Sequence, residues 1–267
     1  MLKKLGVIGY GHMAKAIVKG MKNESIFKDT EFILFDIIRP SKEEEDKPNV
    51  KIANTVEELL KECDTVMFGV RPQNAEDLIK TIKNSVREEH MFISILAGIS
   101  IDFYKSNLGE NVKITRVMPN TPAELGMGAT AVSFSKNISE DGKTTALSIF
   151  KAVGIVEILD EKQMNAVVSV NGSSPAYVYM LADAVAKGAK ELGIDEYTAL
   201  NLFTQTIIGS AHMIQKSGQT PEKLAELVAV PGGTTEAALN VFKSNNFHKI
   251  IAESMKVCTE RAEELSK

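Results

Sequence analysis

"KKLGVIGYGHMAKAIVKGM", residues 3–21, indicates a β-strand, a glycine turn and the start of a helix. Gly9, Gly11 and Ala14 match the small-residue positions of the pattern G-x-G-x-x-G/A, which binds dinucleotides where it joins a strand to a helix. Gly9 would permit a tight turn, Gly11 a close approach of the backbone to a pyrophosphate, and Ala14 close packing of the helix on the strand. The helix start would offer the diphosphate its free N–H groups and its positive dipole end.

The same turn is also compatible with a strand–helix junction in which the glycines serve packing alone. Its surroundings favour the dinucleotide, because short apolar runs alternate with helical patterns through the first half of the chain. The predicted strands cover residues 4–9, 31–36, 64–70, 91–96, 113–120 and 130–135, and predicted helices cover 13–21, 55–63 and 74–86. This alternation predicts parallel βαβ units and an α/β fold with a Rossmann-type doubly wound sheet.

From residue 161 onward, the strand pattern gives way to long helical patterns rich in Ala, Leu and Met. We therefore predict a dinucleotide-binding Rossmann domain over residues 1–160 and an all-helical dimerisation and substrate-binding domain over residues 161–267. Segments 174–189 and 201–214 carry more apolar and small side chains than a helical unit of about 100 residues can bury within itself. We expect a homodimer through this domain, alone or as the unit of a larger homo-oligomer.

Composition and charge argue against several classes of partner. The 267 residues include 31 basic and 35 acidic ones, with a formal net charge of −4 and no sustained basic stripe, so nucleic acid is not expected. No apolar stretch approaches the roughly 18 residues of a membrane helix, and we expect a cytoplasmic protein without a membrane partner. Cys63 and Cys258 are far apart and lack the spacing of metal ligands, so neither a disulfide framework nor a metal site is expected.

Asp36 ends the predicted strand 31–36, where a carboxylate can accept hydrogen bonds from an adenosine ribose. That position favours NAD(H), because a 2′-phosphate would meet a like charge. Arg39 favours the opposite preference, since a guanidinium three residues further on could pair with a 2′-phosphate. Asp36 is also compatible with a surface carboxylate at a strand end. The sequence thus leaves open whether the coenzyme is NADPH or NADH.

Four further segments carry a family resemblance. They are "FGVRPQ" (68–73), "RVMPNTPAELGMG" (116–128), "NGSSPAYVYMLADA" (171–184) and "VPGGTTEAALNVF" (230–242). In order and approximate spacing they resemble the pyrroline-5-carboxylate reductases over nearly the whole chain, and the Pro-Gly-Gly-Thr-Thr segment is the most specific. The resemblance implies reduction of 1-pyrroline-5-carboxylate, a cyclic imine, to L-proline with NADPH or NADH, which is the last step of proline biosynthesis.

Taken with the glycine turn and the strand end, the resemblance also implies the site residues. The coenzyme site would comprise Gly9, Gly11, His12, Met13, Ala14, Asp36, Arg39, Val70, Pro72, Gln73 and Asn120, the last near the nicotinamide ribose. The substrate carboxylate would bind the turn of Gly233, Thr234 and Thr235, and the Thr235 hydroxyl would hydrogen-bond the substrate during catalysis. The chain departs from the family at Val230, where the family commonly carries a small hydroxyl residue.

Without the resemblance, segment 230–242 predicts a helix start that could bind an anion but does not identify a substrate site. Gly232 and Gly233 can adopt positive φ, Thr234 is a good N-cap, and the N–H groups that follow it would be unpaired at a helix start. Such an end can bind a carboxylate. A capped structural helix is the commoner meaning of this pattern, and Glu236 opposes an anion unless its side chain points away.

The chain shows no placed general base of the kind that alcohol oxidation requires. His12 flanks the glycine turn, His90 and His248 lie in polar, loop-like segments, and His212 lies in a helical pattern typical of packing. Reduction of an imine does not require a general base in the protein, because the imine nitrogen can be protonated in water before binding and the product amine keeps that proton. Two alternatives remain, namely a reductase of another imine or a hydroxyacid with the same architecture, and a nucleotide-sensing protein without turnover.

Overall fold

The computed structural model describes residues 2–265, which divide by packing into two compact units. The first unit extends to Pro175 and resumes at Lys256, and the second comprises Ala176–Met255. Helices α7 (Ser174–Glu191) and α11 (Phe247–Leu265) therefore run through the division. The domain boundary predicted at residues 160–161, where the strand pattern ends, stays a prediction.

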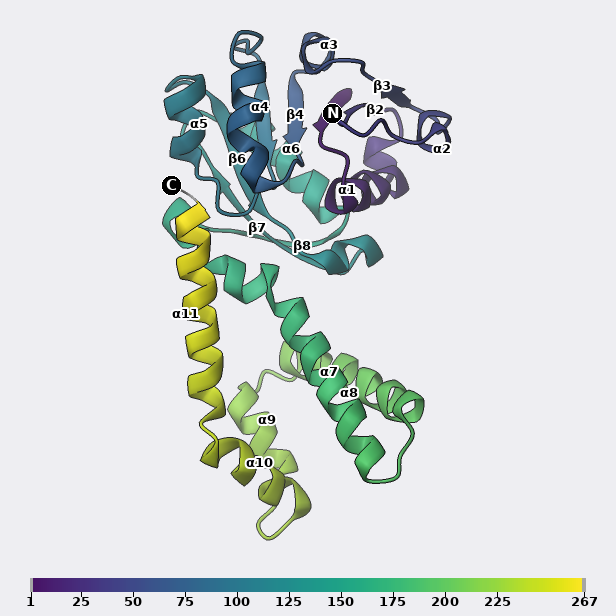
Figure 1. Ribbon diagram of the computed structural model, residues 1–267, viewed down its shortest axis with the longest axis vertical. Coiled ribbons are helices and arrows are strands. Elements are labelled where there is room, and N and C mark those ends of the chain that lie inside the picture. The colour runs from purple at the N-terminus through teal and green to yellow at the C-terminus, as the bar shows by residue number, and fades with distance from the viewer. Residues whose placement is uncertain (1, 266–267) are drawn as a thin grey trace. The chain divides into compact units, whose positions relative to one another are not determined.

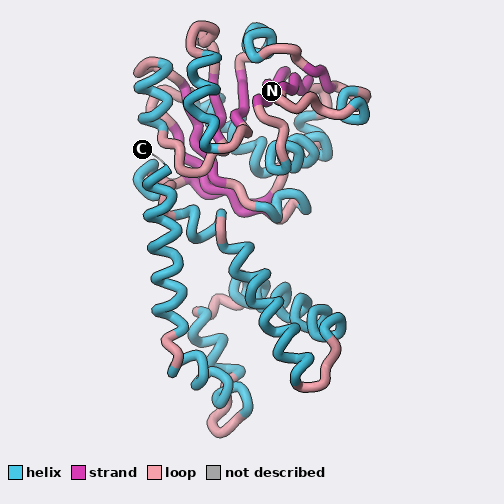
Figure 2. Tube along the Cα trace, viewed as in Figure 1, coloured by secondary structure: helices cyan, strands magenta, loops and turns pink. Residues whose placement is uncertain are grey.

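The first unit is built on one eight-stranded sheet with the order β3-β2-β1-β4-β5-β6-β7-β8 (Figures 1 and 2). The strands are β1 Lys4–Ile8, β2 Glu31–Phe35, β3 Val50–Ile52, β4 Thr65–Phe68, β5 Met91–Ser94, β6 Lys113–Met118, β7 Gly128–Phe134 and β8 Gly154–Ile158. The six strands β1 to β6 run parallel to one another, which confirms the predicted Rossmann-type sheet. The strand order switches sides between β1 and β4, the place where ligands bind in such sheets.

The prediction of parallel units is wrong for β7, which runs antiparallel to β6. Only residues 119–127 connect these two strands, and a parallel crossover needs about a dozen residues or more. β3 and β8 were not predicted. β3 has only three residues, too few for a pattern, whereas β8 is apolar at Ile155, Val156 and Ile158 and sequence reasoning missed it.

Helices cover both faces of the sheet, as a doubly wound fold requires. They are α1 His12–Asn23, α2 Lys42–Glu45, α3 Val56–Glu62, α4 Ala75–Ile82, α5 Ile101–Leu108 and α6 Glu140–Lys151, with the short helices η1 Ser25–Phe27, η2 Pro72–Asn74, η3 Thr121–Leu125, η4 Glu161–Gln163 and η5 Val168–Gly172. The buried side chains of α1 and α6 share one apolar core, and those of α3, α4 and α5 share the other. Figure 1 shows α4 and α5 side by side on their face.

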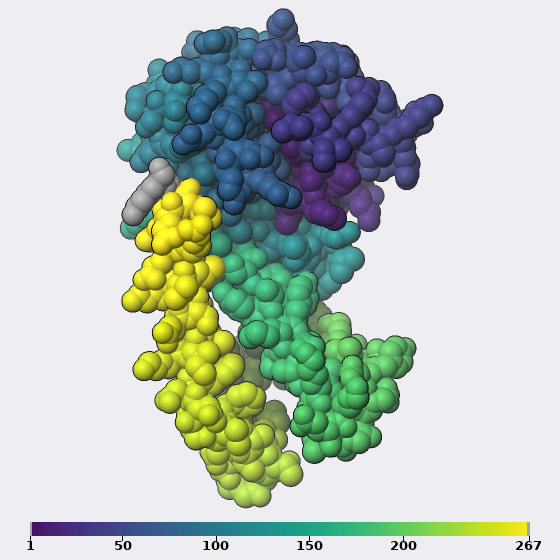
Figure 3. All heavy atoms as spheres, in the orientation of Figure 1, coloured from purple at the N-terminus to yellow at the C-terminus, as the bar shows by residue number. Residues whose placement is uncertain are grey.

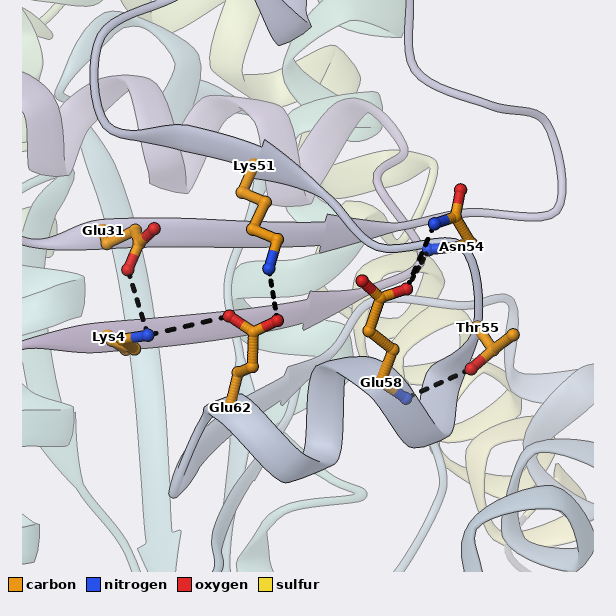
Figure 4. A network of polar contacts seen from close by, with 7 residues as sticks. All are labelled: Lys4, Glu31, Lys51, Asn54, Thr55, Glu58 and Glu62. Carbon is orange, nitrogen blue, oxygen red and sulfur yellow. Dashed lines mark hydrogen bonds and ion pairs between the residues drawn. The ribbon is translucent and has the colours of Figure 1, made fainter.

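Polar contacts fix where α3 begins and how it meets the sheet (Figure 4). The Thr55 hydroxyl accepts a hydrogen bond from the Glu58 N–H at 3.1 Å and so caps the helix. At the other end of α3, Glu62 pairs with Lys4 of β1 at 3.7 Å and with Lys51 of β3. These ion pairs lie at the surface, where each contributes little to stability, but together they orient α3 across two strands.

The second unit is all-helical and buries little of its own surface. It contains most of α7 and the first part of α11, together with α8 Glu196–Lys216, α9 Pro221–Val228 and α10 Thr234–Ser244. Ala186 and Ala199 are its only buried residues among those described, and large apolar side chains such as Tyr179, Met180 and Leu202 are exposed. Figure 3 shows open space between its helices. None of the described helices is both long and apolar enough to cross a membrane.

His90 lies in the loop before β5, as predicted, but its side chain is buried and not in the polar surroundings that were expected. Its side chain is 1% exposed. Nδ1 accepts the Arg87 N–H at 2.8 Å, and Nε2 lies 2.9 Å from the Leu60 carbonyl oxygen, to which it can donate. The ring is thus satisfied as a neutral imidazole, and burial lowers its pKa below the ordinary value.

We predict that this neutral His90 makes the fold lose stability in mild acid. An unfolded histidine binds a proton near pH 6.5, whereas the buried ring binds it only at lower pH. The stabilisation is therefore complete above about pH 6.5 and is lost as the pH falls through the folded-state pKa, at up to about 1.4 kcal/mol per pH unit. Urea unfolding of the wild type at pH 7.5, 6.5 and 5.5 measures the slope.

His90→Gln should show a shallower fall than the wild type between pH 6.5 and 5.5. His212→Gln, at an exposed position of α8, is the matched control and should keep the wild-type slope. Identical slopes for the wild type and His90→Gln would contradict this account.

Candidate active site

Two glycines meet where the chain leaves β1 and β4 at the carboxyl edge of the sheet. The Gly9 N–H donates to the Phe35 carbonyl and the Gly69 N–H to the Ile8 carbonyl, both at 2.8 Å. Gly9 has φ +89°, and a Cβ atom there would lie 2.5 Å from the Val70 nitrogen. A Cβ atom on Gly69 would lie 2.5 Å from the Gly9 oxygen. Both positions therefore require glycine, and Gly69 is a site residue that sequence reasoning missed.

The remaining residues of the glycine turn form the start of α1. Gly11 is the exposed N-cap with φ −78°, and a Cβ atom there would meet no atom within 4 Å. Neither strain nor packing thus requires glycine at this position, and the free space lies where a pyrophosphate would approach the helix start. His12 is exposed, Met13 is half-buried and Ala14 is buried. Ala14 lies against Gly69, so a larger side chain would separate α1 from β4.

The Asp36 carboxylate is held at the end of β2 by two backbone donors. The Tyr10 N–H donates to Oδ2 at 2.6 Å and the Ile38 N–H donates to Oδ1 at 3.0 Å. The Tyr10 hydroxyl in turn donates to Glu44 Oε2 at 3.1 Å. Burial, with the Glu44 carboxylate, raises the pKa of Tyr10 above its ordinary value, so the phenol stays a donor. Asp36 is thereby tied to the glycine turn itself.

Arg39 lies in the same loop but is engaged with other side chains. Its Nη2 contacts Glu45 Oε1 at 3.1 Å and its Nη1 contacts Asn54 Oδ1 at 3.4 Å. The guanidinium is exposed, and its position in the coenzyme site stays a prediction.

The loop after β4 carries three further predicted coenzyme residues. Val70 and Pro72 are half-buried and Gln73 is exposed, with Pro72 and Gln73 in η2. Because β1, β2 and β4 are parallel neighbours, this loop, the glycine turn and Asp36 gather at one edge of the sheet. The structure thus groups these predicted residues as a coenzyme site requires, and their contacts with a coenzyme stay predictions.

Asn120 is buried at the end of β6, and its side chain ties neighbouring segments together. Oδ1 accepts the Ala129 N–H at 2.9 Å, and Nδ2 donates to the Asn171 carbonyl at 3.1 Å. Asn171 itself donates to the carbonyls of Met118 at 2.8 Å and Ala129 at 2.7 Å. Sequence reasoning missed this role of Asn171, although the residue opens the segment 171–184. The pair holds the ends of β6 and β7 against η5.

In the second unit, the helix that follows the predicted substrate turn begins one residue earlier than expected. Gly232 has φ +71° as expected, but Gly233 has φ −85° and is itself the N-cap of α10. Its carbonyl accepts the first helical hydrogen bond, from the Ala237 N–H at 3.2 Å. The prediction that Thr234 is the N-cap is therefore wrong. Thr234 and Thr235 are the first two helical residues, whose N–H groups point out of the helix start.

Two side chains border this turn. Glu236 Oε2 accepts the Gly232 N–H at 2.8 Å, so this carboxylate folds back onto the turn instead of pointing away. Val230 is exposed, and its Cγ2 atom would lie 2.9 Å from a Cβ atom on Gly233. Gly233 is thus needed for the turn to close over Val230. Among the described residues, no group of three or more His, Cys, Asp and Glu side chains is placed to hold a metal ion.

Comparison with known proteins adds an independent finding. Residues 161–265 match the family described as pyrroline-5-carboxylate reductase dimerisation, and residues 4–98 match the family described as NADP oxidoreductase coenzyme F420-dependent. A pyrroline-5-carboxylate reductase of Escherichia coli is 32% identical over 271 residues, which cover 100% of both chains. The chain belongs to the pyrroline-5-carboxylate reductase family. Its matched dimerisation region indicates that it forms homo-oligomers.

Other members of the family agree in sequence and structure. A pyrroline-5-carboxylate reductase of Arabidopsis thaliana is 31% identical, over 98% of this chain and 95% of that one. The crystal structure of a Plasmodium falciparum pyrroline carboxylate reductase with NADP bound is 28% identical and superposes with a TM-score of 0.89 over 100% of both chains. The fold is therefore shared along the full length, including both units.

A side chain at Gly11 would enter open space, whereas one at Gly9 would meet backbone atoms, and this difference yields a prediction. We expect Gly11→Val to weaken coenzyme binding by at least about 100-fold, because the new side chain would fill the space for the pyrophosphate. The melting temperature should stay within a few degrees of the wild type, since that space is free of protein atoms. Fluorescence titration with NADH and NADPH, together with thermal unfolding, measures both effects.

Gly9→Val is the matched control, because the same side chain placed two residues earlier meets the backbone of Val70 at a positive φ. It should lower the melting temperature of the folded chain. Undiminished coenzyme binding by Gly11→Val would rule out the pyrophosphate position.

Proposed function

We propose that this chain reduces 1-pyrroline-5-carboxylate to L-proline by hydride transfer from NADPH or NADH. The observation that carries the proposal is the alignment with the Escherichia coli pyrroline-5-carboxylate reductase across 100% of both chains. Each part of that enzyme therefore has its counterpart in this chain. The open space at Gly11, beside the start of α1 and the fixed Asp36 carboxylate, supports a dinucleotide as the partner.

In this proposal the first unit binds the coenzyme. The turn Gly9–Gly11 and the N–H groups at the start of α1 hold the pyrophosphate, and Asp36 accepts hydrogen bonds from the adenosine ribose. Val70, Pro72 and Gln73 border the coenzyme, and Asn120 positions the loop near the nicotinamide ribose. The reduced nicotinamide supplies the hydride when it is bound.

The helix start of α10 binds the substrate in the same proposal. The Gly233 turn and the N–H groups of Thr234 and Thr235 hold the carboxylate, while the Glu236 carboxylate stays bound to the Gly232 N–H. The Thr235 hydroxyl accepts a hydrogen bond from the protonated ring nitrogen. This bond orients the imine carbon toward the hydride donor and shields the nitrogen from water.

The reaction balances without a general base in the protein. The imine nitrogen enters protonated, the hydride forms a new C–H bond at the imine carbon, and the π electrons of the C=N bond become the lone pair on nitrogen. The product is a secondary amine that keeps the proton. Positioning of two bound reactants is then the main source of rate acceleration.

The working assembly proposed here is a homodimer through the helical domain, alone or within a larger homo-oligomer. It is supported by the exposed apolar side chains of α7, α8 and α10, which a partner surface would cover. We also propose that the chain works in the cytoplasm, since both cysteines are free thiols.

An initial-rate assay tests the function. Oxidation of NADH and NADPH followed at 340 nm should be fast with 1-pyrroline-5-carboxylate and should stay at the background rate with a 2-keto acid or no substrate. Faster turnover of the keto acid would favour a hydroxyacid reductase. Binding of coenzyme without turnover of either compound would favour a nucleotide-sensing protein.

We predict a partial loss of activity for Thr235→Ala. A hydrogen bond to a charged group is typically worth about 1.5–3 kcal/mol, so kcat/KM for the imine should fall roughly 10- to 150-fold. The backbone N–H groups that hold the carboxylate would survive, and coenzyme affinity should barely change. Steady-state kinetics and melting temperature are measured on the same preparation.

Thr235→Ser keeps the hydroxyl and should recover most of the lost kcat/KM. Thr81→Ala, on the exposed surface of α4 in the first unit, is the control for removal of a threonine side chain. Wild-type kinetics with a lowered melting temperature for Thr235→Ala would make the residue structural and remove it from the site.

A further inference from the structure

We propose that this chain selects NADH over NADPH and that Asp36 is the residue that discriminates between them. The inference rests on the coenzyme site of the proposed function. It concerns the position of the 2′-phosphate, by which NADPH differs from NADH. Three features of the loop that follows β2 support it.

The first feature is that the Asp36 carboxylate cannot easily turn aside. Both of its oxygens accept backbone N–H groups, one from Tyr10 at 2.6 Å and one from Ile38 at 3.0 Å. The first of these donors belongs to the glycine turn that would hold the pyrophosphate. The negative charge is therefore fixed at a set distance from the bound dinucleotide, where it can accept ribose hydroxyls but repels a phosphate.

The second feature is the absence of donor side chains directly after Asp36. Ile37 and Ile38 follow, and their side chains are 86% and 84% exposed. A 2′-phosphate needs several hydrogen-bond donors or a bidentate guanidinium to replace its water. These two side chains offer it neither, whereas their apolar surface suits the face of an adenine ring.

The third feature is that three nearby cations already face carboxylates or an aromatic ring. Arg39 contacts Glu45 at 3.1 Å, Lys47 contacts Glu44 at 2.7 Å, and the Lys15 ammonium lies 5.6 Å from the centre of the Tyr10 ring. Recruiting Arg39 to a phosphate would break its contacts with Glu45 and Asn54. The run Glu43–Asp46 in and after α2 adds further negative charge to this side of the site.

The Plasmodium falciparum relative was crystallised with NADP, so a preference for NADH would be a property of this chain's own loop and not of the shared fold. The structure therefore assigns coenzyme choice to residues 36–39 and their contacts. These contacts would act on the coenzyme in the same way whichever substrate is reduced.

Equilibrium titration of coenzyme fluorescence, without any substrate, tests the inference. The wild type should bind NADH at least about tenfold more tightly than NADPH at low ionic strength, and added salt should narrow the difference because it screens the repulsion. Asp36→Asn keeps the size of the side chain and one oxygen acceptor but removes the charge. It should tighten NADPH binding about tenfold and weaken NADH binding. Asp102→Asn, at a carboxylate 89% exposed on α5, is the matched control and should keep the wild-type ratio.

Arg39→Ala tests the alternative, in which the Arg39 guanidinium binds the 2′-phosphate and favours NADPH. If Asp36 governs the choice, Arg39→Ala leaves the affinity for NADPH within about twofold of the wild type. A specific loss of NADPH binding in this variant, equal affinities in the wild type, or an unchanged ratio in Asp36→Asn would overturn the inference. Failure of the imine assay alongside tight NADH binding would overturn the proposed reaction only, and failure to bind either coenzyme would overturn both.

Discussion

The close approach of two backbones at the ends of β1 and β4 is the constraint on which the first unit depends. Gly9 and Gly69 lie so close that a single carbon atom on either would meet the other segment at 2.5 Å or a little more. This contact lets β1 and β4 pair as neighbours and still diverge, one toward α1 and the other toward η2. It also places the start of α1, the end of β2 and the loop after β4 around one point. The candidate coenzyme site follows from this packing.

Each unit offers the backbone N–H groups of a helix start, and we propose that each of these starts receives an anion. At α1 the N-cap is Gly11, with open space beside it, and at α10 it is Gly233, which Val230 crowds from one side. Acidic side chains lie near each helix start, Asp36 at the first and Glu236 at the second. Each accepts a backbone N–H of the adjoining turn, which leaves the N–H groups of the first helical turn for a ligand. Charge is thus positioned by the main chain, with few side chains involved.

The sequence predicts those parts of the fold that rest on local pattern and misses those that rest on distant contacts. The glycine turn and most strands follow from apolar runs of the right length. The direction of β7 depends on the nine residues that precede it, and the buried ring of His90 finds its hydrogen-bond partner on Leu60, thirty residues away. The Asp36 carboxylate is held by the backbone N–H of Tyr10. Every residue except proline has such an N–H group, so no sequence pattern can predict this contact. Gly69 has no local signature either, since one glycine after a strand is common.

We propose that hydride passes from a nicotinamide coenzyme to the imine carbon of the substrate. Reduction of 1-pyrroline-5-carboxylate with NADH deuterated at the transferred position of C4 measures this directly. We expect L-proline with one deuterium at the ring carbon that was doubly bonded to nitrogen, and none elsewhere. Proline without deuterium, or no proline from a preparation that binds the coenzyme, would contradict it.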